Sequence, residues 1–167
     1  MMKFSHIVIV FITFFASAGM AVSQTSSGTQ EYGDGGAYEG EFLNGLPHGN
    51  GTYELPNGYR YVGEWFEGEI NGHGEALFPN GSVYIGSFVK GKPEGSGKIT
   101  FTDGGTYEGE WANGSITGEC YAKYANGTTY QGTFLDAMHD GKGIMKSPDG
   151  YIYDGTWENG VKQGKAT

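Results

Sequence analysis

A tyrosine returns every 23 residues along most of this chain, and the residues around it repeat as well. A glycine stands two residues after each tyrosine, and a large aromatic residue stands two residues after each glycine. Self-similarity at one short, fixed period is typical of stacked copies of a small supersecondary unit. The tyrosine and aromatic positions are Tyr38, Phe42, Tyr61, Trp65, Tyr84, Phe88, Tyr107, Trp111, Tyr130, Phe134, Tyr153 and Trp157.

Each copy has the pattern of a β-hairpin. In the copy at 61–83, side chains alternate between two faces from Tyr61 to Phe66, which is the period of a strand. Residues 68–72 break the alternation and are expected to form a loop, and a second strand then runs to Phe78.

Turn tripeptides close the copies. Pro79-Asn80-Gly81 predicts a tight turn, because proline presets the first turn dihedral and glycine accepts positive φ. The sequence therefore predicts an all-β fold, an elongated single-layer antiparallel meander of stacked hairpins with period 23, preceded by a helical signal peptide.

The repeat also sets the expected domain boundaries. Residues 1–23 are predicted as signal peptide, 24–30 as a polar leader, and 31–37 as an N-terminal half repeat that contributes only its second strand. The repeat domain at 38–167 divides into copies at 38–60, 61–83, 84–106, 107–129 and 130–152 and a truncated copy at 153–167.

The N-terminal segment differs from the rest in composition. Lys3 precedes a largely apolar run at 7–15, and Ala21-Val22-Ser23 offers a small-x-small cleavage site. The competing interpretation is a membrane anchor, but the run is shorter than the roughly 20 residues of a spanning helix. We therefore expect cleavage after Ser23 and a secreted or periplasmic protein.

The charge balance restricts the partners. The formal net charge is −9, so the chain repels nucleic acid and anionic lipid headgroups at long range. Nucleic acid is therefore not an expected partner, and membrane lipid is disfavoured. Cys120 is the only cysteine, so no internal disulfide can form.

No group of residues predicts catalysis, a cofactor or a metal. His48, His73 and His139 stand at three different positions of the copy, without a partner at ligand spacing, and are expected to be exposed loop histidines. Cys120 replaces a repeat glycine and is expected to be a small packing residue rather than a nucleophile. We therefore predict no enzymatic activity.

The pattern resembles the MORN (membrane occupation and recognition nexus) repeat. The family unit runs approximately Tyr-x-Gly-x-Trp-x-x-Gly-x-x-x-Gly-x-Gly, and the first and fourth copies read YEGEFLNGLPHGNG and YEGEWANGSITGEC. The departures are Ala137, Cys120 and Ala166, which replace glycines. The resemblance implies a curved or twisted single-layer sheet that serves in protein binding and assembly, and lipid binding is also attributed to the family. Kinase and methyltransferase segments accompany some family members, but this sequence carries neither.

Two functions remain open at this point. The first is a non-catalytic scaffold that binds a protein partner, or a second copy of itself, through a sheet edge or through the twelve aromatic residues named above. The second is a peripheral lipid- or glycan-binding module at a membrane or cell-envelope surface. The rings could instead pack on one another as a thin core.

Overall fold

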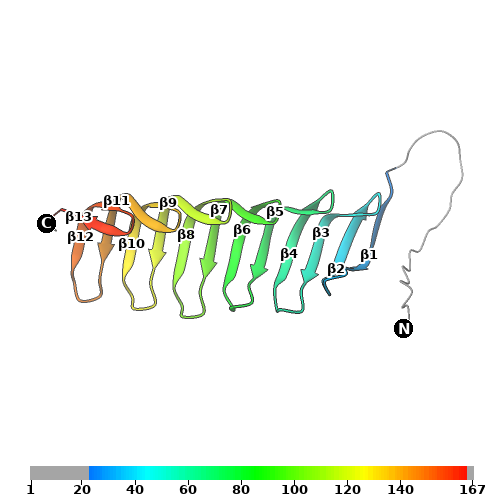
Figure 1. The fold of residues 1–167 in the computed structure, drawn as a ribbon, viewed down its shortest axis with the longest axis horizontal. Coiled ribbons are helices and arrows are strands. Elements are labelled where there is room, and N and C mark those ends of the chain that lie inside the picture. The colour runs from blue at the N-terminus through cyan, green and yellow to red at the C-terminus, as the bar shows by residue number, and fades with distance from the viewer. Residues whose placement is uncertain (1–22, 165–167) are drawn as a thin grey trace, which may run out of the picture.

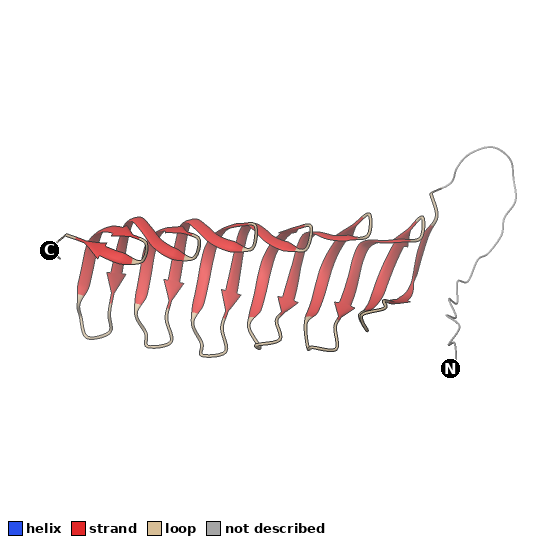
Figure 2. Cartoon of the chain, in the orientation of Figure 1, coloured by secondary structure: helices blue, strands red, loops and turns tan. Residues whose placement is uncertain are grey.

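The computed structural model of this chain describes residues 23–164. The expected signal peptide, apart from Ser23, lies outside the described residues. These residues form strands joined by turns, and no helix is drawn among them in Figure 2. The strands are β1 (Thr25–Glu31), β2 (Ala37–Leu43), β3 (Leu46–Glu54), β4 (Arg60–Phe66), β5 (Glu69–Leu77), β6 (Val83–Val89), β7 (Lys92–Thr100), β8 (Thr106–Ala112), β9 (Ser115–Lys123), β10 (Thr129–Leu135), β11 (Met138–Lys146), β12 (Ile152–Glu158) and β13 (Val161–Gln163).

The described strands make one antiparallel sheet of 13 strands whose spatial order is their order in the chain. The all-β meander predicted from the period is therefore confirmed. Figure 1 shows the strands side by side along an elongated molecule. The turns that join the two strands of a copy lie along the upper margin of that view, and the turns that join one copy to the next lie along the lower margin.

The loop predicted at 68–72 is wrong. The chain reverses in the two residues Glu67 and Gly68, both with positive φ, and β5 begins at Glu69. The pattern breaks there because the second strand contains a β-bulge. Between the pairs Gly63↔Gly74 and Trp65↔Ile70, one residue of β4 faces three of β5. Equivalent register shifts occur in the hairpins of the other full copies, and such bulges bend a strand.

The N-terminal half repeat begins earlier than the sequence pattern indicates. Residues 25–30, expected as part of the polar leader, form β1 together with Glu31, and β1 pairs with all of β2. Residues 32–36 form the turn between these two strands. Because β1 is polar and exposed, it lacks the apolar pattern that marks the other strands, and hydropathy alone could not find it.

Glycines form a line across the middle of the sheet. Paired residues in successive strands are Gly40, Gly51, Gly63, Gly74, Gly86, Gly97, Gly109, Cys120, Gly132, Gly143 and Gly155. A Cβ at Gly51 would stand 2.2 Å from the Tyr38 ring, and one at Gly97 would stand 2.4 Å from Cζ of Tyr84. The glycines are therefore required because tyrosine rings lie directly on their backbone.

Candidate functional site

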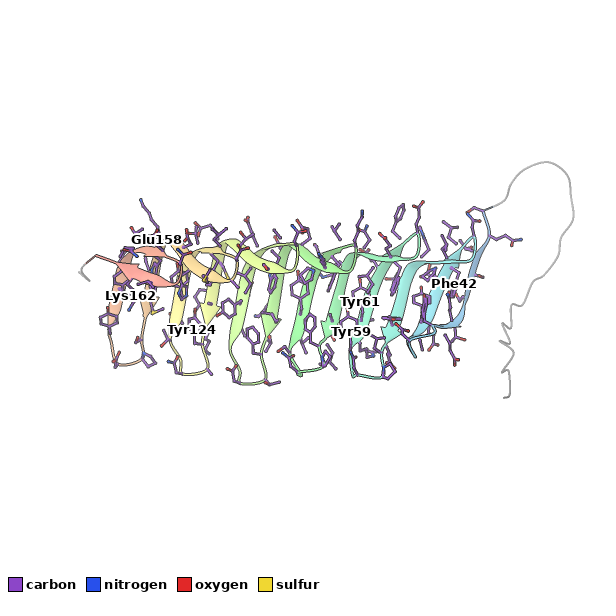
Figure 3. All side chains as sticks on the ribbon, in the orientation of Figure 1. Phe42, Tyr59, Tyr61, Tyr124, Glu158 and Lys162 are labelled. Atoms are coloured by element: carbon purple, nitrogen blue, oxygen red, sulfur yellow. The ribbon has the colours of Figure 1, made fainter. Side chains whose placement is uncertain are left out.

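Most of the twelve aromatic residues predicted to bind a partner lie in the core. Tyr38, Tyr61, Tyr84 and Tyr130 are 0% exposed and belong to one buried cluster with Trp65, Phe88, Trp111, Phe134, Tyr153 and Trp157. Phe42 and Tyr107 are partly buried and pack against the same cluster. Tyr61 and Phe42 are labelled in Figure 3. The rings thus form the thin core that was the alternative, and their partner-binding role stays a prediction.

Two kinds of contact hold each ring. The hydroxyl of Tyr38 donates a hydrogen bond to the carbonyl oxygen of Glu41 at 2.7 Å, and Tyr61, Tyr84, Tyr130 and Tyr153 make the equivalent bond three residues on. Each of these tyrosines except Tyr153, which stands in the last copy, also packs edge-to-face on the aromatic residue of the next copy. The Tyr38 and Trp65 ring centroids, for example, are 4.8 Å apart. The core therefore joins neighbouring copies as well as strands within a copy.

Tyr107 departs from this arrangement. Its slot in the glycine line is occupied by Cys120, and the hydroxyl of Tyr107 makes no equivalent bond to Glu110 among the described residues. The ring keeps its edge-to-face contact with Phe134 of the next copy, and it also packs against Phe101 at 5.6 Å and Tyr124 at 5.8 Å. The side chain of Cys120 thus excludes the tyrosine ring from the slot that a glycine provides elsewhere.

Cys120 itself is buried at 5% exposure, as expected of a packing residue. Burial raises the pKa of its thiol to about 11. A thiolate is therefore a minor species at neutral pH, which does not suit a nucleophile.

The expectation of exposed loop histidines is wrong for His139. It is half-buried on β11, where its ring centroid lies 4.0 Å from that of Tyr130 and 4.6 Å from that of Trp157. Its Nε2 is 2.6 Å from the hydroxyl oxygen of Tyr124. Burial, with a smaller effect of the Lys162 charge, lowers the pKa of His139.

The other two histidines also lie on strands rather than in loops. His48, on β3, accepts a hydrogen bond from the turn amide of Glu67 in the next copy at 3.5 Å. Glu94 and Asp140 make the same kind of bond to later turn amides, at 2.8 and 3.2 Å. His73 is exposed on β5. The copy position that His48, Glu94 and Asp140 share therefore links successive hairpins, a role that the sequence did not reveal.

Glutamates opposite the aromatic face have a structural role at the bulges. The carboxylate of Glu64 accepts a hydrogen bond from the backbone amide of His73 at 2.5 Å, and that of Glu41 accepts one from Asn50 at 3.2 Å. These amides lie in the bulged segments. The glutamates therefore satisfy backbone donors that the bulge removes from the ladder.

Apolar side chains are exposed along the hairpin turns, and we name this set the hairpin-tip ridge. The ridge consists of Leu46, Phe66, Val89, Leu135, Met138 and Val161, which are 44–61% exposed. They stand at the ends of strands beside the two-residue turns, at two equivalent positions of the copies. Glu158, labelled in Figure 3 near the same margin, occupies one of these positions in the last copy. A search for periodic apolar residues outside the aromatic rows would have found this ridge.

We find no candidate metal site among residues 23–164. No group of three or more His, Cys, Asp or Glu side chains there could hold a metal ion. The same residues contain no helix that is long and apolar enough to span a membrane.

The comparisons with known proteins agree with the repeat. The family model described as MORN repeat matches residues 38–58, 61–83, 84–106, 107–129, 130–150 and 153–167. No curated protein sequence matches the chain. Among solved structures, the Drosophila melanogaster SAS-4 (dCPAP) TCP domain, in complex with a proline-rich motif of Ana2 (dSTIL), is 12% identical, with 87% of this chain and 86% of that chain covered and a TM-score of 0.49.

A second similar structure is the Danio rerio CPAP TCP10 domain in complex with a peptide of STIL. It is 18% identical, with 76% of this chain and 62% of that chain covered and a TM-score of 0.28. We draw no functional argument from either likeness.

Proposed function

The chain belongs to the MORN repeat family, and we propose that it is a non-catalytic scaffold that binds a protein partner along the hairpin-tip ridge. The observation that carries this proposal is the exposure of six large apolar side chains on one margin of the sheet. Apolar residues gathered on a surface mark interaction sites more often than scattered ones do.

The geometry of the ridge suits an extended partner. Leu135 and Met138 are directly paired across β10 and β11, and Leu46 stands beside Leu43 in the same way. In the copy at 107–129 the equivalent positions hold the small residues Ala112 and Ser115. The ridge therefore carries large apolar side chains on both sides of the copy at 107–129 and only small side chains in that copy. This arrangement favours a partner that contacts two separated patches.

The buried aromatic rows contribute to this function indirectly. Each copy presents its tip at a set position because its rings pack on the next copy, as Tyr61 does on Phe88 at 5.0 Å. A partner that reached these rings would have to displace packed neighbours, at a cost of several kcal/mol. We therefore place the binding surface on the tips and assign the rings to spacing them.

The test is cross-linking in the native compartment, followed by identification of the captured proteins. A variant with Phe66→Ser and Leu135→Ser removes one large residue from each end of the ridge. We expect this variant to keep its circular dichroism spectrum and to lose the captured partner.

The matched control carries Ile85→Ser and Tyr121→Ser, which remove two equally exposed apolar residues, each 47% exposed, from β6 and β9. The control should still capture the partner. Equal capture by both variants would refute the ridge as the binding surface. Sedimentation of the purified chain gives the contribution of self-association, since a second copy bound at the ridge would dissociate in the ridge variant only.

We also propose that the chain is exported, into the periplasm or outside the cell. The support is the apolar run at 7–15 with the small residues Ala21 and Ser23 after it. N-terminal sequencing of the protein recovered from the cells tests this, with Gln24 expected as the first residue. Recovery of an intact Met1 in the soluble cytoplasmic fraction would contradict it.

A further inference from the structure

An open cavity of about 330 Å³ lies beside Tyr107 on the aromatic face of the sheet. Its lining includes Phe101, Asp103, Tyr107, Ile116 and Tyr124. A cavity of this volume accommodates one extended side chain of a partner, and it lies at the low end of ligand-site volumes.

The walls of the cavity are aromatic rings at right angles. The ring planes of Phe101 and Tyr107 meet at 86°, and those of Tyr107 and Tyr124 meet at 87°. Tyr124 is held in place from outside by its hydroxyl contact with His139. The face of an aromatic ring is electron-rich and attracts a cation, so rings that line one space are suited to a cationic occupant.

The charge of the lining also favours a cation. Asp103 lines the cavity, and its Oδ1 accepts a hydrogen bond from the Gly105 amide at 2.8 Å. Oδ2 has no hydrogen-bond partner within residues 23–164. No lysine or arginine is among the lining residues. An entering ammonium or guanidinium group would therefore meet one carboxylate and no like charge.

The same face of the molecule already holds an ammonium group at an equivalent place. Lys162, labelled in Figure 3, stands in the last copy where Ile116 stands in the copy at 107–129. Its Nζ lies 4.6 Å from the centroid of Tyr151, 5.0 Å from that of Tyr153 and 5.5 Å from that of Trp157. Tyr153 is the counterpart of Tyr107, so the repeat geometry supports cation–aromatic contact at this position.

We propose that the cavity beside Tyr107 binds a basic side chain, lysine or arginine, of the protein partner. This inference rests on the proposed scaffold function and specifies part of the chemistry of the partner. It gives the departure from the glycine line at Cys120 a consequence for recognition, because a glycine there would let the ring of Tyr107 leave the wall of the cavity for its slot.

The test is a titration of the folded protein with N-acetyl-lysine-methylamide, followed by NMR of the aromatic protons. We expect saturable shifts confined to the rings of Phe101, Tyr107 and Tyr124, with weak millimolar affinity. The analogue whose ε-amine is acetylated keeps the stem but loses the charge. It should bind at least about fivefold more weakly. Equal binding of the two compounds would overturn the proposal in favour of a merely apolar pocket.

Two variants separate the site from the fold. Asp103→Asn should weaken binding of the cationic probe and leave the neutral one unchanged. Cys120→Gly should weaken binding of the cationic probe, because the ring of Tyr107 then returns to the slot and no longer forms a wall of the cavity. Both are checked for folding by the unchanged resonances of copies 38–60 and 61–83.

The absence of saturable shifts in the wild-type chain would overturn this inference while leaving partner capture by the ridge untouched. Conversely, capture that is as strong in the ridge variant as in its control, with the titration intact, would contradict the proposed function alone.

Discussion

The substitution Gly97→Ala places a methyl group where a tyrosine ring lies. The new Cβ would stand 2.1 Å from the hydroxyl oxygen of Tyr84 and 2.4 Å from its Cζ. The φ of Gly97 is outside the positive range, so alanine carries no backbone strain and the steric clash is the only direct cost. Tyr84 must therefore leave its slot.

The magnitude follows from what Tyr84 loses. Its hydrogen bond to the Ser87 carbonyl oxygen, at 3.1 Å, contributes about 0.5–1.5 kcal/mol. The edge-to-face contact with Phe88, at 5.1 Å, contributes a similar amount, about 0.5–1.5 kcal/mol. Exposure of part of a ring that is now fully buried costs about 1 kcal/mol more. Alanine recovers about 0.5–1 kcal/mol of backbone entropy relative to glycine. We expect a net loss of about 1–3.5 kcal/mol in the free energy of unfolding.

The assay is equilibrium urea denaturation followed by near-ultraviolet circular dichroism, which reports the packing of the aromatic rings. The matched control is Gly33→Ala, because a Cβ at Gly33 meets no atom within 4 Å. The control should change the free energy of unfolding by less than about 0.5 kcal/mol. If Gly97→Ala is as mild as the control, the argument that the glycines make room for the rings is refuted.

Three other substitutions test separate parts of the structure. Cys120→Gly should let Tyr107 enter its slot. The free energy of unfolding should stay within about 1 kcal/mol of wild type, because the hydrogen bond that Tyr107 gains offsets the entropic cost of a glycine in a strand. A solved structure, or reduced quenching of tyrosine fluorescence, would detect the move of the ring. His139 has a lowered pKa in the folded chain, so the unfolded chain takes up the proton first and stability should fall as the pH drops below the ordinary value of 6.5. His139→Ile should therefore lose less melting temperature than the wild type between about pH 8 and 5. Parallel curves of melting temperature against pH for the two proteins would contradict this. Glu64→Ala should cost about 0.5–1 kcal/mol and speed amide exchange at His73, and unchanged exchange would count against the bulge role.

The period and alternation were sufficient to predict the meander. Tyr61, Gly63 and Trp65 alternate on one strand, and the copies repeat without interruption, so the shared face and the chain order of the strands followed. The position of the two-residue turn did not follow. Glu67 adopts positive φ although it is not glycine, and the bulge of β5 hides the alternation that would have marked a strand.

The candidate site was the less predictable part. The twelve aromatic residues were identified correctly as one face, but whether that face is a core or a surface depends on how far each ring is covered by the next copy. Trp65 covers Tyr38 at 4.8 Å, a contact between residues of different copies that no local pattern encodes. The hairpin-tip ridge has a periodic apolar signal in the sequence, at Phe66, Val89 and Leu135, but the exposure of these side chains is a property of the assembled sheet.

By itself, the sequence determined that this protein is a row of β-hairpins with glycines beneath aromatic rings, because periodicity in residue type is local information. Only the tertiary structure decided which rings are covered, that Cys120 displaces Tyr107, and that His139 lies among aromatic rings rather than in a loop. Those outcomes depend on close contacts between neighbouring copies. A single side chain too large for its slot changes them without altering the repeat pattern.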